Sequence, residues 1–554
     1  MPERFDAVVV GAGLAGLYML HRLRGMGLSV RVYEAGSDVG GTWYWNRYPG
    51  ARCDVESLAY SYSFSDELQQ QWEWTDRYPP QPEILRYINH VADRFDLRRD
   101  IRFERRVESA RFNEAECLWE VRTDKGNEAW APFCIMATGC LSTPLEPDLP
   151  GLEDFAGGVY RTNLWPHGNV RFEGRRVGIF GTGSTGIQAI PVIAREAAHL
   201  TVFQRTANYS IPAVNGPLDP AFVRAFKARY AEHREHQRLG LSMGAGDLEA
   251  AARDMKPMLP TAEKVTQAEV NRVCETYWSR GGAHFMGAIG DVMSNEASNR
   301  RVADFVRTRI RAIVRDPETA ETLCPTTHPI GTKRICVDTD YYATYNRPNV
   351  SLINLRKTPV ESIEPQGVRL ADRLVELDDL VLATGFDAMT GALLRMDIRG
   401  SHGRKLSQAW RDGPRTYLGL MVPGFPNLFT VTGPGSPSVL SNMVVSIEQH
   451  VEFIAGILEH MRERGYQSIR ANPQAEADWT AEVAKRANAT LYSKGGSWYL
   501  GANVEGKPRM FMPYVGGVGA YRSTCESVAA NGYRGFNFRR DAPAAATHAG
   551  ASGS

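Results

Sequence analysis

The sequence has 554 residues, which is too long for one hydrophobic core, so we expect two or three domains. Hydrophobic residues make up 43% and charged residues 23%, as in ordinary globular proteins, and a net charge of +1 gives no reason to expect a nucleic acid or an anionic membrane as partner. No apolar run approaches the ~18 residues of a membrane span, and the N-terminus lacks the pattern of a signal peptide, so we expect a cytoplasmic protein. The eight cysteines are scattered without C-x-x-C spacing, which indicates neither a metal site nor a redox dithiol.

The first predicted element is a dinucleotide-binding strand–helix–strand unit over residues 5–34. The apolar run FDAVVV leads into GAGLAG, where Gly11, Gly13 and Gly16 have G-x-G-x-x-G spacing, and the second strand, SVRVYE, ends in Glu34. Gly11 makes the tight turn, Gly13 lets the backbone approach a pyrophosphate, and Gly16 allows helix and strand to pack closely. Because a carboxylate at Glu34 can accept ribose hydroxyls, the unit is expected to bind a dinucleotide with a free ribose, such as FAD.

A second unit of the same kind follows at residues 175–206. The strand RRVGIF leads into GTGSTG, with Gly181, Gly183 and Gly186 at the three glycine positions. Where the first unit has its acid, this one has a glutamine followed by Arg205. A carboxylate would repel a 2′-phosphate, whereas an arginine can hold it with charge-assisted hydrogen bonds, so we expect this unit to bind NADPH rather than NADH. The alternative is that Arg205 is an exposed arginine with no special role.

Two apolar strands close on Ala-Thr-Gly, in residues 134–142 and 380–388, as at the ends of the nucleotide-binding modules of flavoproteins with two dinucleotides. The order of these elements predicts an α/β fold of two Rossmann-like domains with a helical insertion. The expected division is an FAD domain at residues 1–145 and 388–540, an NADPH domain at 155–210 and 325–385, the helical insertion at 215–320 and a disordered tail at 541–554. One amphipathic helix in the insertion is expected to bury Val302, Phe305, Val306, Ile310 and Ile313.

Longer motifs accompany the two glycine loops. They are GGTWYWNRYPGARCDVES, FAGGVYRTNLWP, VFQRTANYSIPA, GTKRICVDTDYYATYNRPNV, GPGSPSVLSNM and SWYLGANVEGKPRMFM. Together they resemble the type I Baeyer–Villiger monooxygenases, most closely the phenylacetone and steroid monooxygenase branch, over almost the whole chain. N- and S-oxygenating flavin monooxygenases share the glycine loops but usually lack the Trp-Pro seen here as Trp165-Pro166.

The resemblance implies the reaction and its cofactors. NADPH would reduce FAD, O2 would form a C4a-peroxyflavin, and one oxygen would be inserted next to a ketone carbonyl to give an ester or a lactone. The substrate pocket would draw on residues 141–142, 437–440 and 511–512, which are small or apolar, so a bulky, mostly apolar ketone is expected: aryl, cyclic, macrocyclic or steroid. A monomer without a nucleic-acid or membrane partner is the expected form.

Two catalytic residues follow from the resemblance. Arg334, in GTKRICV, matches the active-site arginine, a permanent cation that can stabilise an oxyanion. Asp54, in ARCDVES, matches an acid that orients this arginine and holds the nicotinamide part of NADP⁺. Lys333 matches a residue that reaches the 2′-phosphate beside Arg205. By composition alone Lys333 and Arg334 would be a solvated loop pair, and Asp54 a helix N-cap.

The residues expected to bind the cofactors are Gly11, Gly13, Ala15, Gly16, Glu34, Thr42, Trp43, Trp45, Arg52, Cys53, Asp54, Tyr60, Val107, Thr182, Gly183, Ser184, Thr185, Gly186, Ile187, Gln188, Arg205, Thr206, Lys333, Arg334, Met443 and Trp498.

Several members of this set have a specific expected place. Trp43 and Trp45 would pack around the flavin, and Trp498 would lie on a mobile loop that closes on NADP⁺ and substrate. Met443 would contact the flavin near the start of a helix that runs to about residue 460 and is capped by Ser436 or Ser438. Ordinary core packing is the alternative for the two tryptophans, for Val107 and for Met443.

One position departs from the family pattern, because Arg161 stands where the hinge fingerprint has histidine. An arginine donates hydrogen bonds but never accepts one, so we expect altered domain motion or NADPH coupling with activity retained. The alternatives are a flavin-binding relative that has lost turnover and an N- or S-oxygenating flavin monooxygenase.

Overall fold

The computed structural model describes residues 2–126, 128–240 and 258–540. The tail predicted at 541–554 and residues 241–257 of the predicted insertion lie outside the described residues. Within the described part of the chain, no helix is both long and apolar enough to cross a membrane.

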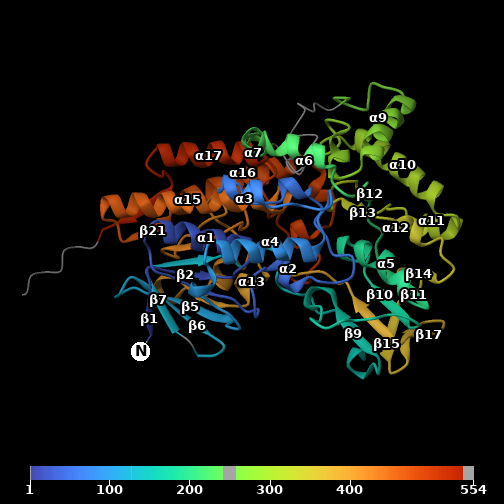
Figure 1. The fold of residues 1–554 in the computed structure, drawn as a ribbon, viewed down its shortest axis with the longest axis horizontal. Coiled ribbons are helices and arrows are strands. Elements are labelled where there is room, and N and C mark those ends of the chain that lie inside the picture. The colour runs from blue at the N-terminus through green and yellow to red at the C-terminus, as the bar shows by residue number, and fades with distance from the viewer. Residues whose placement is uncertain (1, 127, 241–257, 541–554) are drawn as a thin grey trace, which may run out of the picture.

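The first parallel sheet carries the first glycine loop. Its strand order is β20 (Leu428–Thr430), β8 (Phe133–Met136), β2 (Ala7–Val10), β3 (Val30–Tyr33) and β4 (Ile101–Arg102). All neighbours are parallel, and every residue of β2 and β3 is buried, as expected for strands covered on both faces. Helix α1 (Leu14–Gly25) leaves the loop and packs against the long α15 (Met443–Arg464), which lies beside it in Figure 1.

The second parallel sheet carries the second glycine loop and lies at the other end of the molecule (Figure 1). Its order is β14 (Val350–Asn354), β11 (His199–Gln204), β10 (Arg176–Phe180), β18 (Asp379–Leu382) and β9 (Gly158–Arg161), again all parallel. Helix α5 (Ser184–Glu196) leaves the loop, as α1 does in the first sheet. In both sheets the glycine loop follows a strand that has neighbours on both sides.

Smaller sheets flank these two. A mixed sheet beside the first has the order β1 (Glu3–Arg4), β7 (Glu128–Ala131), β6 (Leu118–Thr123), β5 (Val107–Asn113) and β19 (Asp397–Arg399). An antiparallel one beside the second consists of β15 (Val360–Glu364), β16 (Gly367–Leu370) and β17 (Leu374–Glu376). Two strand pairs join β12 (Ser210–Pro212) to β13 (Cys336–Asp338) and β21 (Ser468–Ala471) to β22 (Phe536–Arg539).

Four further helices contribute buried residues to the core of the first sheet. They are α3 (Asp66–Gln71), α4 (Gln81–Arg94), α16 (Pro473–Asn488) and α17 (Val518–Ala530), and the short α2 (Thr42–Trp45) follows the first nucleotide unit.

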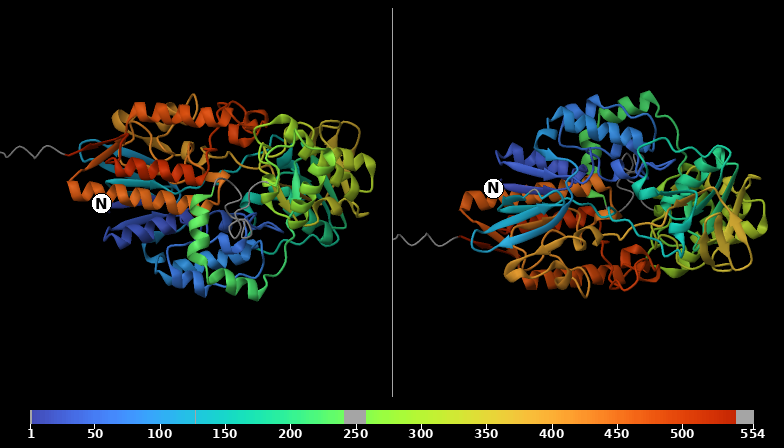
Figure 2. Two further views of the ribbon diagram at one scale, coloured as in Figure 1. Left: turned by 90° about the horizontal axis from the view of Figure 1, so that it is seen from above. Right: turned by 90° about the horizontal axis from the view of Figure 1, so that it is seen from below.

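The helices between residues 215 and 323 are shared between two hydrophobic cores. Helices α6 (Pro220–Lys227) and α7 (Tyr230–Leu239) join the core of the first sheet through Val223, Phe226 and Tyr230. Helices α9 (Gln267–Arg280), α10 (Glu296–Ile313) and α11 (Pro317–Leu323) contribute to the core of the second, and they lie at the same end of the molecule as that sheet in Figure 2. The face predicted on α10 buries Val302, Phe305, Val306 and Ile310, whereas Ile313 is half-buried at the last turn.

Two chain segments cross side by side between the sheets, after β8 and after β18. Leu145 donates its backbone N–H to the Gly385 carbonyl at 3.1 Å, and Thr384 donates its hydroxyl to the Leu145 carbonyl at 3.1 Å. Arg161, the last residue of β9, donates from Nη2 to Glu146 at 2.8 Å beside this crossing. The position that departs from the family pattern is therefore a half-exposed ion pair at the link between the two sheets.

Candidate active site

The first glycine loop has the shape that a dinucleotide needs. Gly11 has φ +104°, and a Cβ there would lie 2.6 Å from the Ala137 carbonyl oxygen. A Cβ at Gly16 would lie 1.8 Å from the Gly11 carbonyl oxygen, so only glycine lets helix α1 start this close to the loop. No side chain caps α1 at Gly13, which leaves its first N–H groups available for phosphate oxygens.

Glu34 directly follows β3, at the end of the second strand of the unit. Its two carboxylate oxygens accept the backbone N–H groups of Ala12 and Gly36, both at 2.7 Å, and the side chain is buried. Burial raises the pKa of Glu34, and these two hydrogen bonds oppose the rise. Each oxygen keeps a lone pair for a hydroxyl donor, so the geometry fits FAD.

The second loop repeats this geometry. Gly181 has φ +111°, a Cβ there would lie 2.4 Å from the Ala383 carbonyl oxygen, and one at Gly186 would lie 2.0 Å from the Gly181 carbonyl oxygen. At Gly183 a Cβ would meet nothing within 4 Å, and no side chain caps α5.

The second strand of this unit ends differently from that of the first. Gln204 is buried and donates its Nε2 to the Thr322 carbonyl at 2.7 Å. The next residue, Arg205, is exposed and lies close enough to Lys333 to lower the pKa of that lysine, after burial, which is the larger cause. Arg356 contributes to the same effect. These three cations fit the 2′-phosphate of NADPH.

Arg334 and Asp54, 280 residues apart in sequence, form a two-point ion pair. Nε and Nη2 of Arg334 donate to Oδ2 and Oδ1 of Asp54 at 2.7 and 2.8 Å, and Nη1 donates to the Val439 carbonyl at 2.6 Å. Both side chains are 23% exposed. Asp54 does not cap a helix, because the next turn, Ser57–Ala59, begins after Glu56.

The ion pair fixes both charges. Burial alone would raise the pKa of Asp54, but the charge and hydrogen bonds of Arg334 outweigh this and hold the pKa below its ordinary value. Burial likewise opposes the charge of Arg334, and Asp54 holds its pKa well above the ordinary range. Both groups therefore stay ionised at working pH.

The pair lines a small cavity of about 10 Å³, together with Val55, Ala283, Ile335 and Ser441. This is about the volume that one water molecule occupies. Tyr499 is buried beside the guanidinium, and burial raises the pKa of its hydroxyl. A neutral phenol and a permanent cation thus lie side by side.

Segment 48–52 of the first unit lies against helix α5 of the second. Gln188 on α5 donates its Nε2 to the Arg52 carbonyl at 3.1 Å and accepts from the Tyr48 hydroxyl at 2.8 Å. Gly50 has φ +83°, and a Cβ there would lie 2.4 Å from the Gln188 carbonyl oxygen. The predicted residues Arg52 and Gln188 are therefore brought together at the junction between the two units. Cys53 is buried next to Asp54, and burial raises the pKa of its thiol.

Two predicted aromatic residues meet on the side of the first unit. Trp43 is buried and donates its Nε1 to the Tyr60 hydroxyl at 3.1 Å, with the rings edge to face. Trp45 is half-buried and packs edge to face on Tyr44, while Thr42 is exposed at the start of α2.

The predicted cap of the helix after GPGSPSVLSN was wrong. Asn442, not Ser436 or Ser438, accepts the N–H of Val444 at 3.0 Å, and α15 begins at Met443. Ser436 instead donates its hydroxyl to the Gly433 carbonyl at 2.7 Å, and Ser438 lies in a preceding 3₁₀ turn with φ +43°. The helix continues to residue 464, four residues beyond the predicted end.

The other predicted cofactor residues take up varied positions. Ala15 and Ile187 are buried in the first turns of α1 and α5, and Val107 is buried at the start of β5. Ser184 and Thr185 open α5, with the Ser184 hydroxyl 3.3 Å from the Cys336 sulfur. The Thr182 hydroxyl donates to the Thr206 carbonyl at 3.0 Å, which joins the glycine loop to the end of β11.

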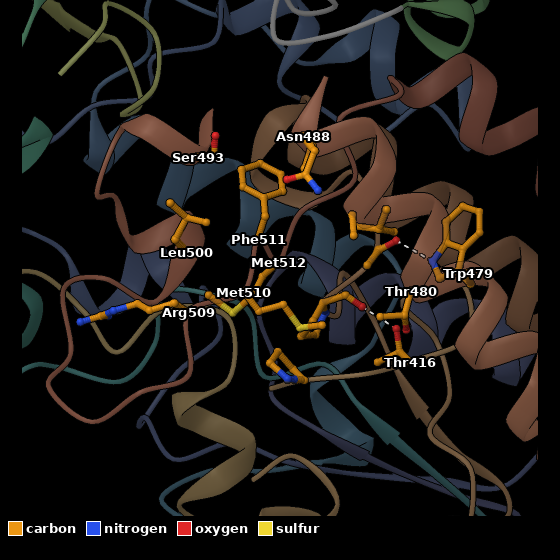
Figure 3. Close-up of a pocket in the computed structure, with 16 residues that line it drawn as sticks. Thr416, Trp479, Thr480, Asn488, Ser493, Leu500, Arg509, Met510, Phe511 and Met512 are labelled. Carbon is orange, nitrogen blue, oxygen red and sulfur yellow. Dashed lines mark hydrogen bonds between the residues drawn. The ribbon is translucent and has the colours of Figure 1, made fainter. Parts of the chain in front are cut away.

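An apolar cluster contains part of each segment expected around the substrate, but not Pro437 or Ser438. It contains Cys140, Leu141, Val439, Leu440, Met443, Tyr492, Trp498, Tyr499, Phe511 and Met512, whereas Ser142 is exposed. Phe511 and Met512 also form one wall of a cavity of about 330 Å³, whose other wall carries Trp479 and Thr480 of α16 (Figure 3). Trp479 is held there by donating its Nε1 to the Gly435 carbonyl at 3.0 Å.

Three contributions were missed by the sequence interpretation. The Val439 carbonyl that accepts from Arg334 belongs to the backbone, so the pattern of side chains in the sequence could not predict this contact. Tyr499 directly follows Trp498 in SWYLGAN and could have been noticed there. Arg356, in NLRKTP, resembles any solvated loop cation until β14 places it beside the end of β11.

Comparison with known proteins agrees with this geometry. The family described as pyridine nucleotide-disulphide oxidoreductase matches residues 8–240, which contain both glycine loops. An acetone monooxygenase (methyl acetate-forming) of Gordonia sp. (strain TY-5) is 42% identical over 96% of this chain and 98% of its own length. A Baeyer–Villiger monooxygenase of Pseudooceanicola batsensis is 42% identical over 96% of this chain and 95% of its own length.

A solved structure is also similar over its whole length. Oxidised steroid monooxygenase bound to NADP superposes with a TM-score of 0.91 at 50% identity and covers 97% of this chain and 100% of its own. The two paired glycine loops, the Arg334–Asp54 pair and end-to-end identities above 40% lead to one conclusion. The chain belongs to the Baeyer–Villiger monooxygenases, which use FAD and NADPH.

Proposed function

We propose that this monooxygenase converts bulky, mostly apolar ketones into esters or lactones, with Arg334 as the group that stabilises developing negative charge on the ketone oxygen. The observation that carries the proposal is the state of the Arg334 guanidinium. Among the described residues, its hydrogen bonds to Asp54 and Val439 occupy three of its five N–H donors; the other two are used by neither group, and the Tyr499 hydroxyl lies beside the guanidinium. Donors of this kind are typically worth 10²–10³ in rate, or about 2.7–4 kcal/mol of barrier.

Asp54 acts through this arginine. Because Asp54 accepts hydrogen bonds from both Nε and Nη2, the guanidinium plane cannot rotate, and the directions of its other two N–H bonds are fixed. The low pKa of Asp54 keeps the carboxylate ionised, and therefore keeps both hydrogen bonds, at every working pH. Asp54 would also hold the nicotinamide part of NADP⁺ next to Arg52 and Cys53.

The residues of the two loops are proposed to hold the cofactors. Gly11, Gly13, Gly16 and Glu34 would hold FAD, and Gly181, Gly183 and Gly186 with Arg205, Thr206 and Lys333 would hold NADPH. When bound, FAD and NADPH supply the electrons and the activation of O2. The chain supplies the fixed cation and an apolar wall that excludes water, which strengthens the charge interactions at Arg334.

The apolar cluster supports the substrate class. Val439, Leu440, Phe511 and Met512 offer no charged partner to a ligand, and Val439 adjoins Arg334 through its carbonyl. A ketone with a large hydrocarbon part would be desolvated against these side chains while its oxygen faces the guanidinium.

The domain division stays a proposal, supported by the two parallel sheets: an FAD domain of residues 1–145 and 388–540, and an NADPH domain of 155–210 and 325–385. The monomeric state and the cytoplasmic location also stay predictions. Light scattering after size-exclusion chromatography would test the first, and cell fractionation the second.

Product analysis tests the function. The protein with NADPH and O2 is given cyclohexanone, phenylacetone, a macrocyclic ketone and progesterone, with a thioether and an aromatic N-heterocycle for comparison. We expect esters or lactones from at least one bulky ketone and a loss of about 10²–10³ in Arg334→Met at unchanged flavin content. Sulfoxides or N-oxides alone would contradict the proposed substrate class.

A further inference from the structure

Three cations lie close together at the carboxyl edge of the second sheet. Arg205 follows β11, Arg356 follows β14, and Lys333 comes from the loop before β13. Because β11 and β14 are neighbouring parallel strands, with Gln204 opposite Asn354, the residues after them lie side by side. Among residues 2–126, 128–240 and 258–540, none of the three cations forms an ion pair with a carboxylate. Like charges held together without an anion indicate a site for one.

Arg356 is tied to the residues that follow β11. Its Nε donates to the Arg205 carbonyl at 2.9 Å, and its Nη2 donates to the Thr206 hydroxyl oxygen at 3.2 Å. The Thr206 carbonyl in turn accepts from the Thr182 hydroxyl of the glycine loop. The backbone of residues 205–206 is thus held from both sides.

The bond to Thr206 fixes the direction of a proton. A threonine hydroxyl has one O–H donor, and a guanidinium has donors only. Since the Thr206 oxygen accepts from Arg356, its own hydrogen must point away from Arg356, and it meets no acceptor within the part of the chain that the structure describes. Nη1 of Arg356 likewise has no partner there. An acceptor-only group such as a phosphate dianion would satisfy both.

We propose that Arg356 determines the preference for NADPH, by presenting the Thr206 hydroxyl as a donor to the 2′-phosphate and by adding a third positive charge to Arg205 and Lys333. This inference rests on the proposed NADPH site. The side-chain hydrogen bonds of Arg356 go to residues 205 and 206 and not to Arg334 or Asp54, so we assign it to coenzyme specificity and not to the chemical step.

Binding of 2′-AMP and 5′-AMP, measured by calorimetry on the flavin-loaded protein, tests this without turnover. Arg356→Met is expected to weaken 2′-AMP about 10-fold, the size of one charge-assisted hydrogen bond, and to leave 5′-AMP unchanged. Lys357→Ala is the matched control. Lys357 follows Arg356 in sequence and pairs with Glu318 at 3.6 Å on the surface, so its loss should change the affinity for neither ligand. In turnover, Arg356→Met should raise the KM for NADPH and leave the kcat and all constants for NADH unchanged.

A double-mutant cycle separates the two parts of the proposal. If Arg356 acts through the hydroxyl, Arg356→Met should weaken 2′-AMP less in a Thr206→Val background than in the natural protein, and Arg356→Lys should restore only the charge contribution. Unchanged 2′-AMP binding in Arg356→Met, with a loss in Arg205→Ala, would overturn the inference and leave the proposed NADPH site standing. Unchanged binding in Arg205→Ala and Lys333→Ala would overturn that site as well.

Discussion

The two nucleotide-binding units have nearly the same backbone. The first glycine has φ +104° in one loop and +111° in the other. A Cβ added to the third glycine would lie 1.8 Å from a carbonyl oxygen in the first loop and 2.0 Å from one in the second. The residues before α1 and α5 also agree, at φ −80° and ψ −169° for Gly13 against φ −83° and ψ −173° for Gly183. The contacts that close a glycine loop are therefore independent of which nucleotide it serves.

The units differ in chemistry at the end of the second strand. Glu34 turns its carboxylate onto backbone N–H groups of its own loop, whereas Gln204 turns its amide away, to Thr322. The next residue, Arg205, is exposed. The direction of the Gln204 side chain thus removes the acceptor that Glu34 offers in the first unit, and the proposed preference for a phosphate rests on Arg205, Lys333 and Arg356.

The largest effect is expected when the shared loop geometry is broken in each unit separately. Gly16→Ala places a methyl 1.8 Å from a backbone oxygen and should leave less than about a tenth of the protein with bound flavin, because large distortions of packed backbone are among the most destabilising changes. Gly186→Ala, at 2.0 Å, should keep the flavin and slow its reduction by NADPH at least about 100-fold. Flavin absorbance and anaerobic stopped-flow measure the two.

Gly25→Ala serves as the control, since a Cβ there meets nothing within 4 Å and alanine favours a helix. If Gly16→Ala and Gly186→Ala impaired the same step, the assignment of one nucleotide to each unit would be wrong.

A smaller effect is expected from giving the second unit the acid of the first. In Gln204→Glu the donor to Thr322 is lost and a buried carboxylate faces a carbonyl oxygen, so the protein should lose about 1–3 kcal/mol of stability. NADH should not become the preferred coenzyme, because the side chain at position 204 points away from the loop towards Thr322, and Arg205 keeps its positive charge. Chemical denaturation and the NADPH/NADH ratio of kcat/KM measure both; an NADH-preferring, fully stable variant would refute the distinction.

Each half of the molecule also contains a buried neutral histidine. Burial lowers the pKa of His450 to about 3, and burial with the charge of Lys333 lowers that of His328 to about 4. The unfolded chain binds these protons near pH 6.5 and the folded protein does not, so stability is full above pH 6.5 and is lost as the pH falls. For His450 the loss at pH 5 should be about 2 kcal/mol.

In the natural protein, Nδ1 of His450 accepts the backbone N–H of Thr432 at 2.8 Å. His450→Asn keeps an acceptor for this N–H but cannot titrate. The denaturation midpoint should therefore change less between pH 7.5 and pH 5 in this variant than in the natural protein. Equal slopes in the two proteins would show that His450 is not the group responsible.

The smallest effect is expected at the link between the units. Arg161 and Glu146 are an exposed pair of a kind worth about 0–1 kcal/mol. Arg161→His should change the fraction of NADPH oxidised without product, or the rate, by about twofold to threefold, with Glu146→Gln giving a similar shift. An inert natural protein made active by Arg161→His would contradict the view that the hinge variant is functional.

Local features of the fold and the site could be predicted from the sequence. The glycine loops, Glu34 and Arg205 depend on residues within about 25 positions of one another, so their spacing determines their geometry. The Arg334–Asp54 pair spans 280 residues and was available only through the resemblance to a family. The cap of α15 was missed because four candidate polar residues lie in one loop and only backbone direction selects Asn442.

The helices after residue 215 show the same limit. Amphipathic pattern identified the apolar face of α10, but it does not say which of two cores that face joins. Nor does it show that α7 packs against the other core.

The contact of Gln188 with segment 48–52 has a consequence for engineering by recombination. A chimera that replaces residues 155–385 as one cassette would place a foreign α5 against Gly50. The Gln188 carbonyl of α5 lies so close to Gly50 that even a Cβ would not fit between them, so a helix placed slightly differently would clash there. Residues 155 and 385 are therefore not sufficient as the boundaries of a segment that can be exchanged between relatives. Residues 48–52 belong with the cassette, although they lie more than 100 residues before it.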